Sequence, residues 1–117
     1  SDLLSKADII TLHVPLLSST THLIGTKEFS LMKPTALLIN TSRGDLVDEN
    51  ALIQVLRNQK IAGAGLDVFP KEPHVSPELK ALDHVVLTPH ISAYTKEARE
   101  QMAMIALERF VDDFLTT

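Results

Sequence analysis

Apolar residues form short runs along most of the chain, and polar or turn-forming residues separate these runs. Several runs are rich in apolar and β-branched residues and stop at a proline or a polar cluster, which is the pattern of a strand in a sheet. They cover residues 7–14, 36–40, 61–69 and 85–88. The second run has no polar residue before Asn40, so we expect that strand to be buried on both faces.

Polar capping residues between these runs predict helices. Asp48 is a good N-cap for a helix over residues 49–57, whose apolar positions share one face. Thr26 is expected to cap a short helix over residues 27–32. Ser76 is expected to start another short helix, because the proline that follows it is favoured at the first helical position.

The last part of the chain changes to a helical period. Thr95 is expected to cap a helix over residues 96–115, whose apolar positions we assign to core or interface packing rather than to cofactor binding. Residues 1–6 are expected to form the end of a helix or one short turn. Strands that alternate with helices predict an α/β fold, with a parallel sheet of about four strands, helices on both faces and a long final helix.

Composition limits the classes of protein that this chain can belong to. Its 117 residues suffice for one domain, and 44% hydrophobic with 22% charged residues is a globular composition. A net charge of -4 argues against a nucleic-acid surface, and the lack of cysteine excludes disulfides and thiolate metal sites. We see no signal peptide and no apolar run near the roughly 18 residues of a membrane span, so we expect a cytoplasmic protein. Because the chain starts at Ser1, we expect it to be cut from a longer one.

Four residues with reactive side chains follow the predicted strands. In a parallel sheet all strands end at one edge, where ligands of such folds bind, so we expect Arg43, Asp67, Glu72 and His90 to converge there. The guanidinium of Arg43 offers a planar fork for a carboxylate, and His90 can exchange a proton near neutral pH. Glu72, if adjacent, would favour the imidazolium form of His90. This set predicts acid–base chemistry on an oxyanionic substrate, which is worth roughly 10²–10⁴ in rate.

Each of these residues also has an ordinary explanation. Arg43 could cap carbonyl groups in its own loop, His90 and Glu72 could be solvated loop residues, and Asp67 could cap a turn. The expected meeting of all four residues at one sheet edge is what favours a catalytic site. Gly63 interrupts the third predicted strand, as does the glycine two residues later, and we expect a backbone or a ligand to approach closely there. No spacing of histidines and acidic residues suggests a metal site, and no Gly-x-Ser-x-Gly turn is present.

Seven segments of the chain form a combination that is typical of one protein family. They are His13-Val14-Pro15-Leu16, Met32-Lys33-Pro34, Ile39-Asn40-Thr41-Ser42-Arg43-Gly44, Val47-Asp48-Glu49, Ala62-Gly63-Ala64-Gly65-Leu66-Asp67-Val68-Phe69, Glu72-Pro73 and Thr88-Pro89-His90-Ile91. With these segments the chain resembles the NAD-dependent D-isomer-specific 2-hydroxyacid dehydrogenases. That family includes D-3-phosphoglycerate, glyoxylate/hydroxypyruvate and D-lactate dehydrogenases.

The resemblance implies a role for each candidate residue. Arg43 would hold the substrate carboxylate and polarise the carbonyl, His90 would exchange a proton with the 2-oxo oxygen, and Glu72 would orient and charge His90. The cofactor would be NAD, with NADP as the alternative, and Asp67 would contact its nicotinamide carboxamide. The other positions implied to line the cofactor are Val14, Pro15, Thr20, Thr41, Ser42, Arg43, His90, Ser92 and Ala93.

The chain also departs from the family pattern. It has only four glycines, and none of them makes the Gly-x-Gly-x-x-Gly turn that places the pyrophosphate on a helix N-terminus. We therefore interpret residues 1–117 as the C-terminal portion of a Rossmann-type NAD-binding domain, without its glycine-rich first half and without the substrate domain. On its own, such a chain would be inactive.

Two other functions stay open, and one assembly is expected. The chain could be an NAD(H)-binding regulatory module of the corepressor type, or a self-associating half-domain with inert site residues. The strand over residues 7–14 would have an unpaired edge, and the helix over residues 96–115 would lose packing partners. We expect a homodimer through one of these surfaces.

Overall fold

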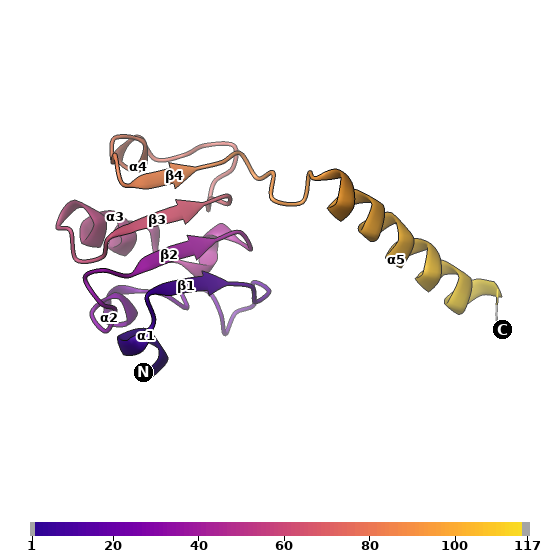
Figure 1. Ribbon diagram of the computed structural model, residues 1–117, viewed down its shortest axis with the longest axis horizontal. Coiled ribbons are helices and arrows are strands. Elements are labelled where there is room, and N and C mark those ends of the chain that lie inside the picture. Colours follow the sequence, from indigo (N-terminus) through magenta and orange to yellow (C-terminus); the bar gives the residue numbers. More distant parts are fainter. Residues whose placement is uncertain (1, 116–117) are drawn as a thin grey trace.

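The computed structural model describes residues 2–115 and contains one sheet of four parallel strands in the order β1-β2-β3-β4 (Figure 1). The strands are β1 (Ile9–Leu12), β2 (Leu37–Asn40), β3 (Gly63–Leu66) and β4 (Val85–Leu87). In the parallel register Ile10 lies opposite Leu38, Leu38 opposite Ala64, and Ala64 opposite Val85. The predicted parallel α/β sheet is confirmed, with strands that are shorter than the apolar runs.

Helices connect the strands and follow the last one. They are α1 (Asp2–Lys6), α2 (Thr26–Phe29), α3 (Glu49–Arg57), α4 (Pro77–Lys80) and α5 (Lys96–Leu115), with a 3₁₀ turn over Gly44–Leu46. Three predicted caps are confirmed. Asp48 accepts a hydrogen bond from the N–H of Ala51 at 3.1 Å, Ser76 accepts one from Glu78 at 3.2 Å, and Thr95 accepts one from Ala98 at 3.1 Å.

The prediction for α2 is wrong in its cap and its length. The N-cap is Gly25, and the helix starts at Thr26 and ends at Phe29. The carboxylate of Glu28 accepts a hydrogen bond from the N–H of Gly25 at 3.1 Å, which is one half of a capping box. A carboxylate that reaches back from the third helical position thus replaces the side-chain cap that we expected at Thr26.

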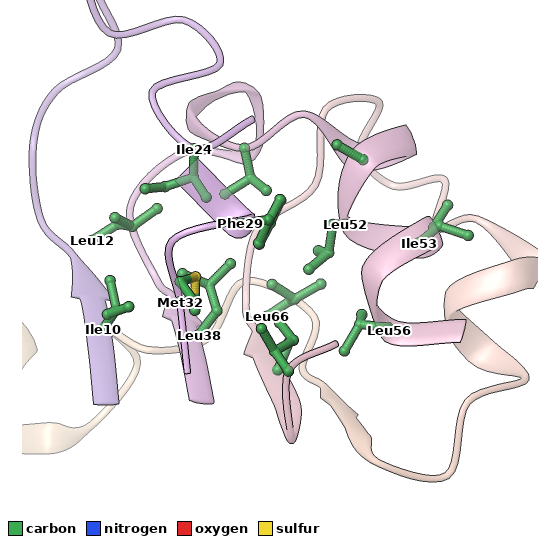
Figure 2. Close-up of a cluster of buried hydrophobic side chains, with 14 of the residues drawn as sticks. Ile10, Leu12, Ile24, Phe29, Met32, Leu38, Leu52, Ile53, Leu56 and Leu66 are labelled. Atoms are coloured by element: carbon green, nitrogen blue, oxygen red, sulfur yellow. The ribbon is translucent and has the colours of Figure 1, made fainter. Parts of the chain in front are cut away.

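The hydrophobic core lies on one face of the sheet. Alternate strand residues point into it, and helices α2 and α3 cover it, so that Leu38 and Leu56 are fully buried. Figure 2 shows this cluster between the strands and α3; its labelled members are Ile10, Leu12, Ile24, Phe29, Met32, Leu38, Leu52, Ile53, Leu56 and Leu66. Buried apolar area of this kind is the main favourable contribution to folding.

The opposite face of the sheet is open, which corrects our expectation that residues 36–40 are buried on both faces. Leu37 is 39% exposed, and its neighbours on the same face, Ile9 and Val86, are 62% and 67% exposed. Within residues 2–115 no helix shields these side chains, so the second layer of helices that we expected is not seen. We call the surface formed by Ile9, Leu37 and Val86 the open sheet face.

Helix α5 projects away from the sheet and gives the molecule its length of 57 Å (Figure 1). Its large apolar side chains are exposed, as for Met102 at 51% and Phe114 at 69%. The rings of Phe110 and Phe114 stack on each other with centroids 5.1 Å apart. Apolar residues occur on most sides of this helix, which is typical of a helix that is buried in its final environment. Among the helices of residues 2–115, none has the length and apolarity to cross a membrane.

Gly63 should tolerate no side chain, because a Cβ there would overlap the carbonyl oxygen of His84. We expect Gly63→Ala to lower the free energy of unfolding by about 1–3 kcal/mol or more, the usual cost of overpacking. Gly65→Ala is the control on the same strand, since its Cβ would meet only the mobile Cδ1 of Ile39 at 3.0 Å. Urea unfolding measures both, and equal losses would contradict the close approach at Gly63.

Candidate functional site

The candidate residues lie at the carboxyl edge of the sheet, on the side where the connection to α5 leaves (Figure 1). Arg43 follows β2, Asp67 and Glu72 follow β3, and His90 follows β4. The parallel direction of the strands brings these loops to one edge, as predicted. The side chains of these residues make distinct contacts.

Glu72 and His90 form a hydrogen-bonded pair. One carboxylate oxygen of Glu72 lies 2.8 Å from Nδ1 of His90, and the other accepts the N–H of Phe69 at 3.0 Å. The bond to His90, followed by the bond from Phe69, lowers the pKa of Glu72 below its ordinary value. Because the ionised carboxylate can only accept, Nδ1 is the donor and Nε2 is free to face a ligand.

The surroundings of this pair leave it accessible. The side chains of Glu72 and His90 are 37% and 48% exposed. Both border an open hollow of about 520 Å³, together with Pro89, Ala93, Tyr94, Arg99 and Met102. A hydrogen-bonded imidazole that faces a hollow of this size can exchange a proton with a small molecule.

Asp67 anchors the loop that carries His90. It is 3% exposed, and its carboxylate accepts hydrogen bonds from the hydroxyl of Thr88 and from the N–H groups of Ile91 at 2.9 Å and Ser92 at 2.8 Å. Burial would raise the pKa of Asp67, but these hydrogen bonds outweigh burial and lower the pKa to about 2. His90 sits between these contacts with a φ of 56°, in the left-handed region, which histidine adopts more often than most residues other than glycine.

Arg43 stays outside this network. Its side chain is exposed, and Nη1 donates a hydrogen bond to the carbonyl oxygen of Ser42 at 2.6 Å. No ion pair or hydrogen bond within residues 2–115 links its guanidinium to Glu72 or His90. The loop itself is packed, because a Cβ on Gly44 would overlap the backbone of Phe69. The structure therefore places Arg43 on a neighbouring loop with its guanidinium available to an anion.

Asn40 is a residue that the sequence interpretation did not single out as functional. It is 1% exposed, its Nδ2 donates to the carbonyl oxygen of Arg43 at 2.8 Å, and its Oδ1 accepts the N–H of Ser42 at 3.1 Å. The only signal in the sequence was an amide at the end of an apolar run. A buried amide there needs partners, and the following turn supplies them.

Known proteins match both the sequence and the fold. The family profile described as D-isomer specific 2-hydroxyacid dehydrogenase, NAD binding domain, matches residues 1–92. This chain belongs to that family. A glyoxylate reductase of Thermococcus litoralis is 56% identical over 109 residues, which cover 93% of this chain and 33% of that protein. The chain thus spans about a third of the length of this curated relative.

Solved structures of family relatives have the same fold with bound cofactors. D-lactate dehydrogenase with NAD+ from Lactobacillus jensenii matches with a TM-score of 0.81 and 41% identity, over 92% of this chain and 36% of that one. An acyclic imino acid reductase in complex with NADPH and D-Arg matches with a TM-score of 0.86 and 43% identity, over 97% of this chain and 36% of that one. NAD is the cofactor of the family, and relatives are known with NAD+ and with NADPH.

The loops of this 2-hydroxyacid dehydrogenase segment at the carboxyl edge carry exposed positions among those predicted to line the cofactor. Val14, Pro15 and Ala93 are exposed, the first two in the loop after β1 and Ala93 in the loop after β4. Ser42 donates its hydroxyl hydrogen to the carbonyl oxygen of Val14 at 2.7 Å, which ties the loops after β1 and β2 together. The chain has no glycine-rich turn for the pyrophosphate.

Thr20 and Asp67, two further predicted cofactor positions, hold loops in place through their side chains. The hydroxyl of Thr20 donates to the carbonyl oxygen of Pro15 at 2.8 Å and accepts the N–H of Leu17 at 2.7 Å. Both carboxylate oxygens of Asp67 accept hydrogen bonds from the loop of His90. Thr20 holds the loop after β1, and Asp67 holds the loop after β4. No group of histidine and acidic residues within residues 2–115 could hold a metal ion.

Asp67 should make the stability of the chain depend on pH. Its pKa is lowered by folding, so the unfolded chain takes up the proton first, and the stabilisation present above about pH 4 is lost as the pH falls through about 2. A shift of about two units corresponds to roughly 2–3 kcal/mol. Urea unfolding at several pH values between these limits should show a flatter dependence for Asp67→Asn. The exposed Asp83→Asn is the control, and parallel curves for Asp67→Asn and the unsubstituted chain would contradict the assignment.

Proposed function

We propose that this chain supplies the proton-transfer and carboxylate-binding half of the active site of an NAD-dependent 2-hydroxyacid dehydrogenase. The observation that carries the proposal is the contact of 2.8 Å between Nδ1 of His90 and a carboxylate oxygen of Glu72. That contact engages Nδ1 and leaves Nε2 for a ligand. The names of the relatives, glyoxylate reductase and D-lactate dehydrogenase, agree with a small 2-oxo or 2-hydroxy acid as the substrate.

In the proposed mechanism His90 and Glu72 act as a unit. During reduction Nε2 of His90 donates a proton to the 2-oxo oxygen of the substrate, and during oxidation it accepts the proton of the hydroxyl group. The carboxylate of Glu72 stabilises the charged imidazolium and holds the ring, because its second oxygen is fixed by the N–H of Phe69. When bound, the nicotinamide cofactor supplies or accepts the hydride.

Arg43 binds the substrate carboxylate in this proposal. Its guanidinium now bonds to a neutral carbonyl oxygen, that of Ser42. A carboxylate is a stronger acceptor and fits two parallel N–H groups of the planar fork. Holding the carboxylate there also orients the adjacent carbonyl toward the proton donor, and such positioning contributes a large share of enzymatic rate enhancement.

The rest of the active site lies outside this chain in our proposal. Residues 1–117 form the C-terminal portion of the NAD-binding domain of a cytoplasmic enzyme, and Val14, Pro15, Thr20, Thr41, Ser42, Asp67, Ser92 and Ala93 lie on the cofactor side. The phosphate-binding turn and the wall of the substrate pocket come from other sequence. The isolated chain is then inactive, and the identity of the acid is read by residues that it does not contain.

A chimera tests the proposed roles of Glu72 and His90. The matching segment of the Thermococcus litoralis glyoxylate reductase, which is 56% identical, is replaced by this chain, and glyoxylate reduction is followed by NADH absorbance. His90→Asn should lower kcat by about 10² or more, and Glu72→Gln by a smaller factor, because general acid catalysis is lost or weakened. His74→Asn, at an exposed position in the loop after β3, is the control and should leave kcat unchanged.

The outcomes separate the functions. A chimera that turns over, with kcat unaffected by His90→Asn, would refute the assignment of the proton donor. A chimera that binds NADH without turnover would favour the regulatory module of the corepressor type.

The substitution Arg43→Lys in the same chimera tests the carboxylate clamp. We expect KM for glyoxylate to rise by about tenfold or more, because a single ammonium cannot replace two parallel N–H donors. Arg57→Lys is the matched control, since Arg57 is an exposed arginine that pairs with Glu78 at 3.0 Å on the outside of α3. An unchanged KM in Arg43→Lys would show that the substrate carboxylate binds elsewhere.

We also propose that the isolated chain forms a homodimer, on the evidence of the exposed apolar residues of α5. Met104 and Phe110 are 53% and 54% exposed, as are most apolar side chains of that helix. The outer edge of β1 offers a second surface, because unpaired strand edges recruit further strands.

Sedimentation tests the homodimer. The unsubstituted chain should sediment as a dimer at high micromolar concentration, and Phe110→Glu should dissociate it, whereas Gln101→Glu on the same helix should not. A monomeric unsubstituted chain would refute self-association, and a dimer that survives Phe110→Glu would assign the contact to the edge of β1.

A further inference from the structure

Two polar side chains are buried in the part of the chain that the structure describes, and both lie at the carboxyl edge of the sheet. Asn40, the last residue of β2, is 1% exposed, and Asp67, just after β3, is 3% exposed. The N–H of Asp67 donates to the carbonyl oxygen of Asn40 at 2.9 Å. The two residues are therefore neighbours in adjacent strands, joined by the last rung of the ladder.

Asn40 bonds to the loop that carries Arg43. Its amide closes a turn by accepting from the N–H of Ser42 and donating to the carbonyl oxygen of Arg43. The backbone of Arg43 is extended, with φ of -144° and ψ of 139°. Because both bonds end on the backbone on either side of the Arg43 Cα, they set the direction in which the guanidinium leaves the sheet.

Asp67 has the same relation to the loop that carries His90. Its carboxylate receives Ile91 and Ser92 N–H groups in succession, which is the geometry of an anion held in a backbone nest. His90 immediately precedes these donors and has a φ of 56°. The left-handed backbone of His90 is thus followed directly by two N–H groups that bond to Asp67, which fixes the loop on the C-terminal side of His90.

We propose that Asn40 and Asp67 are positioning residues that together fix the placement of Arg43 relative to His90. This inference rests on the proposed function of those two residues. A buried polar group is costly unless it is paired, and an apolar side chain would serve packing at either position. Here the partners are the backbone groups of the two loops, together with the Thr88 hydroxyl. The last backbone bond between β2 and β3 makes the two anchors one rigid unit.

Kinetics of the chimera with the Thermococcus litoralis enzyme test the inference, because a displacement near 1 Å can cost about 10² in rate. Asn40→Ala should raise KM for glyoxylate by about tenfold or more while kcat changes by less than about threefold, since the loosened residue binds the substrate. Asp67→Asn should lower kcat by about tenfold or more with KM nearly constant, since the loosened residue transfers the proton. Asn50→Ala, at an exposed asparagine in the first turn of α3, should change neither constant.

Amide hydrogen exchange in the 117-residue chain gives a second readout that needs no activity. Asn40→Asp keeps the acceptor for the N–H of Ser42 but loses the donor to Arg43, so Ser42 should stay protected in that variant and become exposed to exchange in Asn40→Ala. Asp67→Asn should increase exchange at Ile91 and Ser92 and leave Ser42 unchanged. In each case we expect about a tenfold change in the exchange rate at the named amide.

The kinetics of the chimera and the amide exchange of the 117-residue chain can contradict the inference independently of each other. Loss of protection confined to each variant's own loop, with the split between KM and kcat, supports the inference. A uniform loss of protection across the chain, or equal effects of both variants on KM and kcat, would show that Asn40 and Asp67 serve general stability and would overturn it. An inactive unsubstituted chimera would refute the proposed function, and the exchange pattern would still decide whether each residue anchors its loop.

Discussion

Parallel pairing of the strands is the constraint on which this structure depends. Strands that run in one direction must be joined by crossovers, and all of their carboxyl ends then meet at one edge. The crossovers supply α2 and α3, which cover the core face of the sheet, and the strand ends supply the loops that carry Arg43, Glu72 and His90. A core made of residues such as Leu38 and Leu56 is thus what holds together residues that are far apart in the sequence.

The two strand ends in the middle of the sheet use buried polar groups in place of apolar ones. Asp67 stays ionised with a pKa of about 2 because three donors surround it, although it lies under the loop that carries His90. The pKa of Glu72, in the loop that follows Asp67, is also below its ordinary value, but the side chain of Glu72 is exposed to solvent. The carboxylate of Asp67 bonds to the loop of His90, whereas the carboxylate of Glu72 bonds to the imidazole of His90. This difference comes from their surroundings.

Much of this organisation follows from local sequence rules. The strands, the long final helix, the caps at Asp48, Ser76 and Thr95, and the arrival of the loops of Glu72 and His90 at one sheet edge were predictable from period, capping chemistry and strand direction. Their direct contact was implied by the family resemblance alone. The Gly25 cap was not predictable, because its partner is a carboxylate that reaches back from Glu28.

The remaining differences depend on tertiary contacts. The open sheet face could not be predicted either, because an apolar run looks the same whether or not a helix covers its second side. Asn40 and the anchoring contacts of Asp67 depend on which loop lies above each strand end, which a single sequence does not report. The positions after the strands identified the reactive side chains, and the resemblance to a family supplied a role for each. Neither identified Asn40, which holds the turn before Arg43.

Position 90 is subject to two separate requirements, because its backbone is left-handed and its side chain is the proposed proton donor. The conformation is open to glycine and is adopted by asparagine, aspartate and histidine more often than by other residues, but β-branched or bulky residues are strained there. Proton transfer, in contrast, requires the imidazole. A relative that has lost catalysis but kept its fold would therefore be expected to carry asparagine or glycine at the equivalent of position 90. Such a residue, together with an aspartate at the equivalent of Asp67, would identify a relative that has the fold of the enzyme without its catalytic activity.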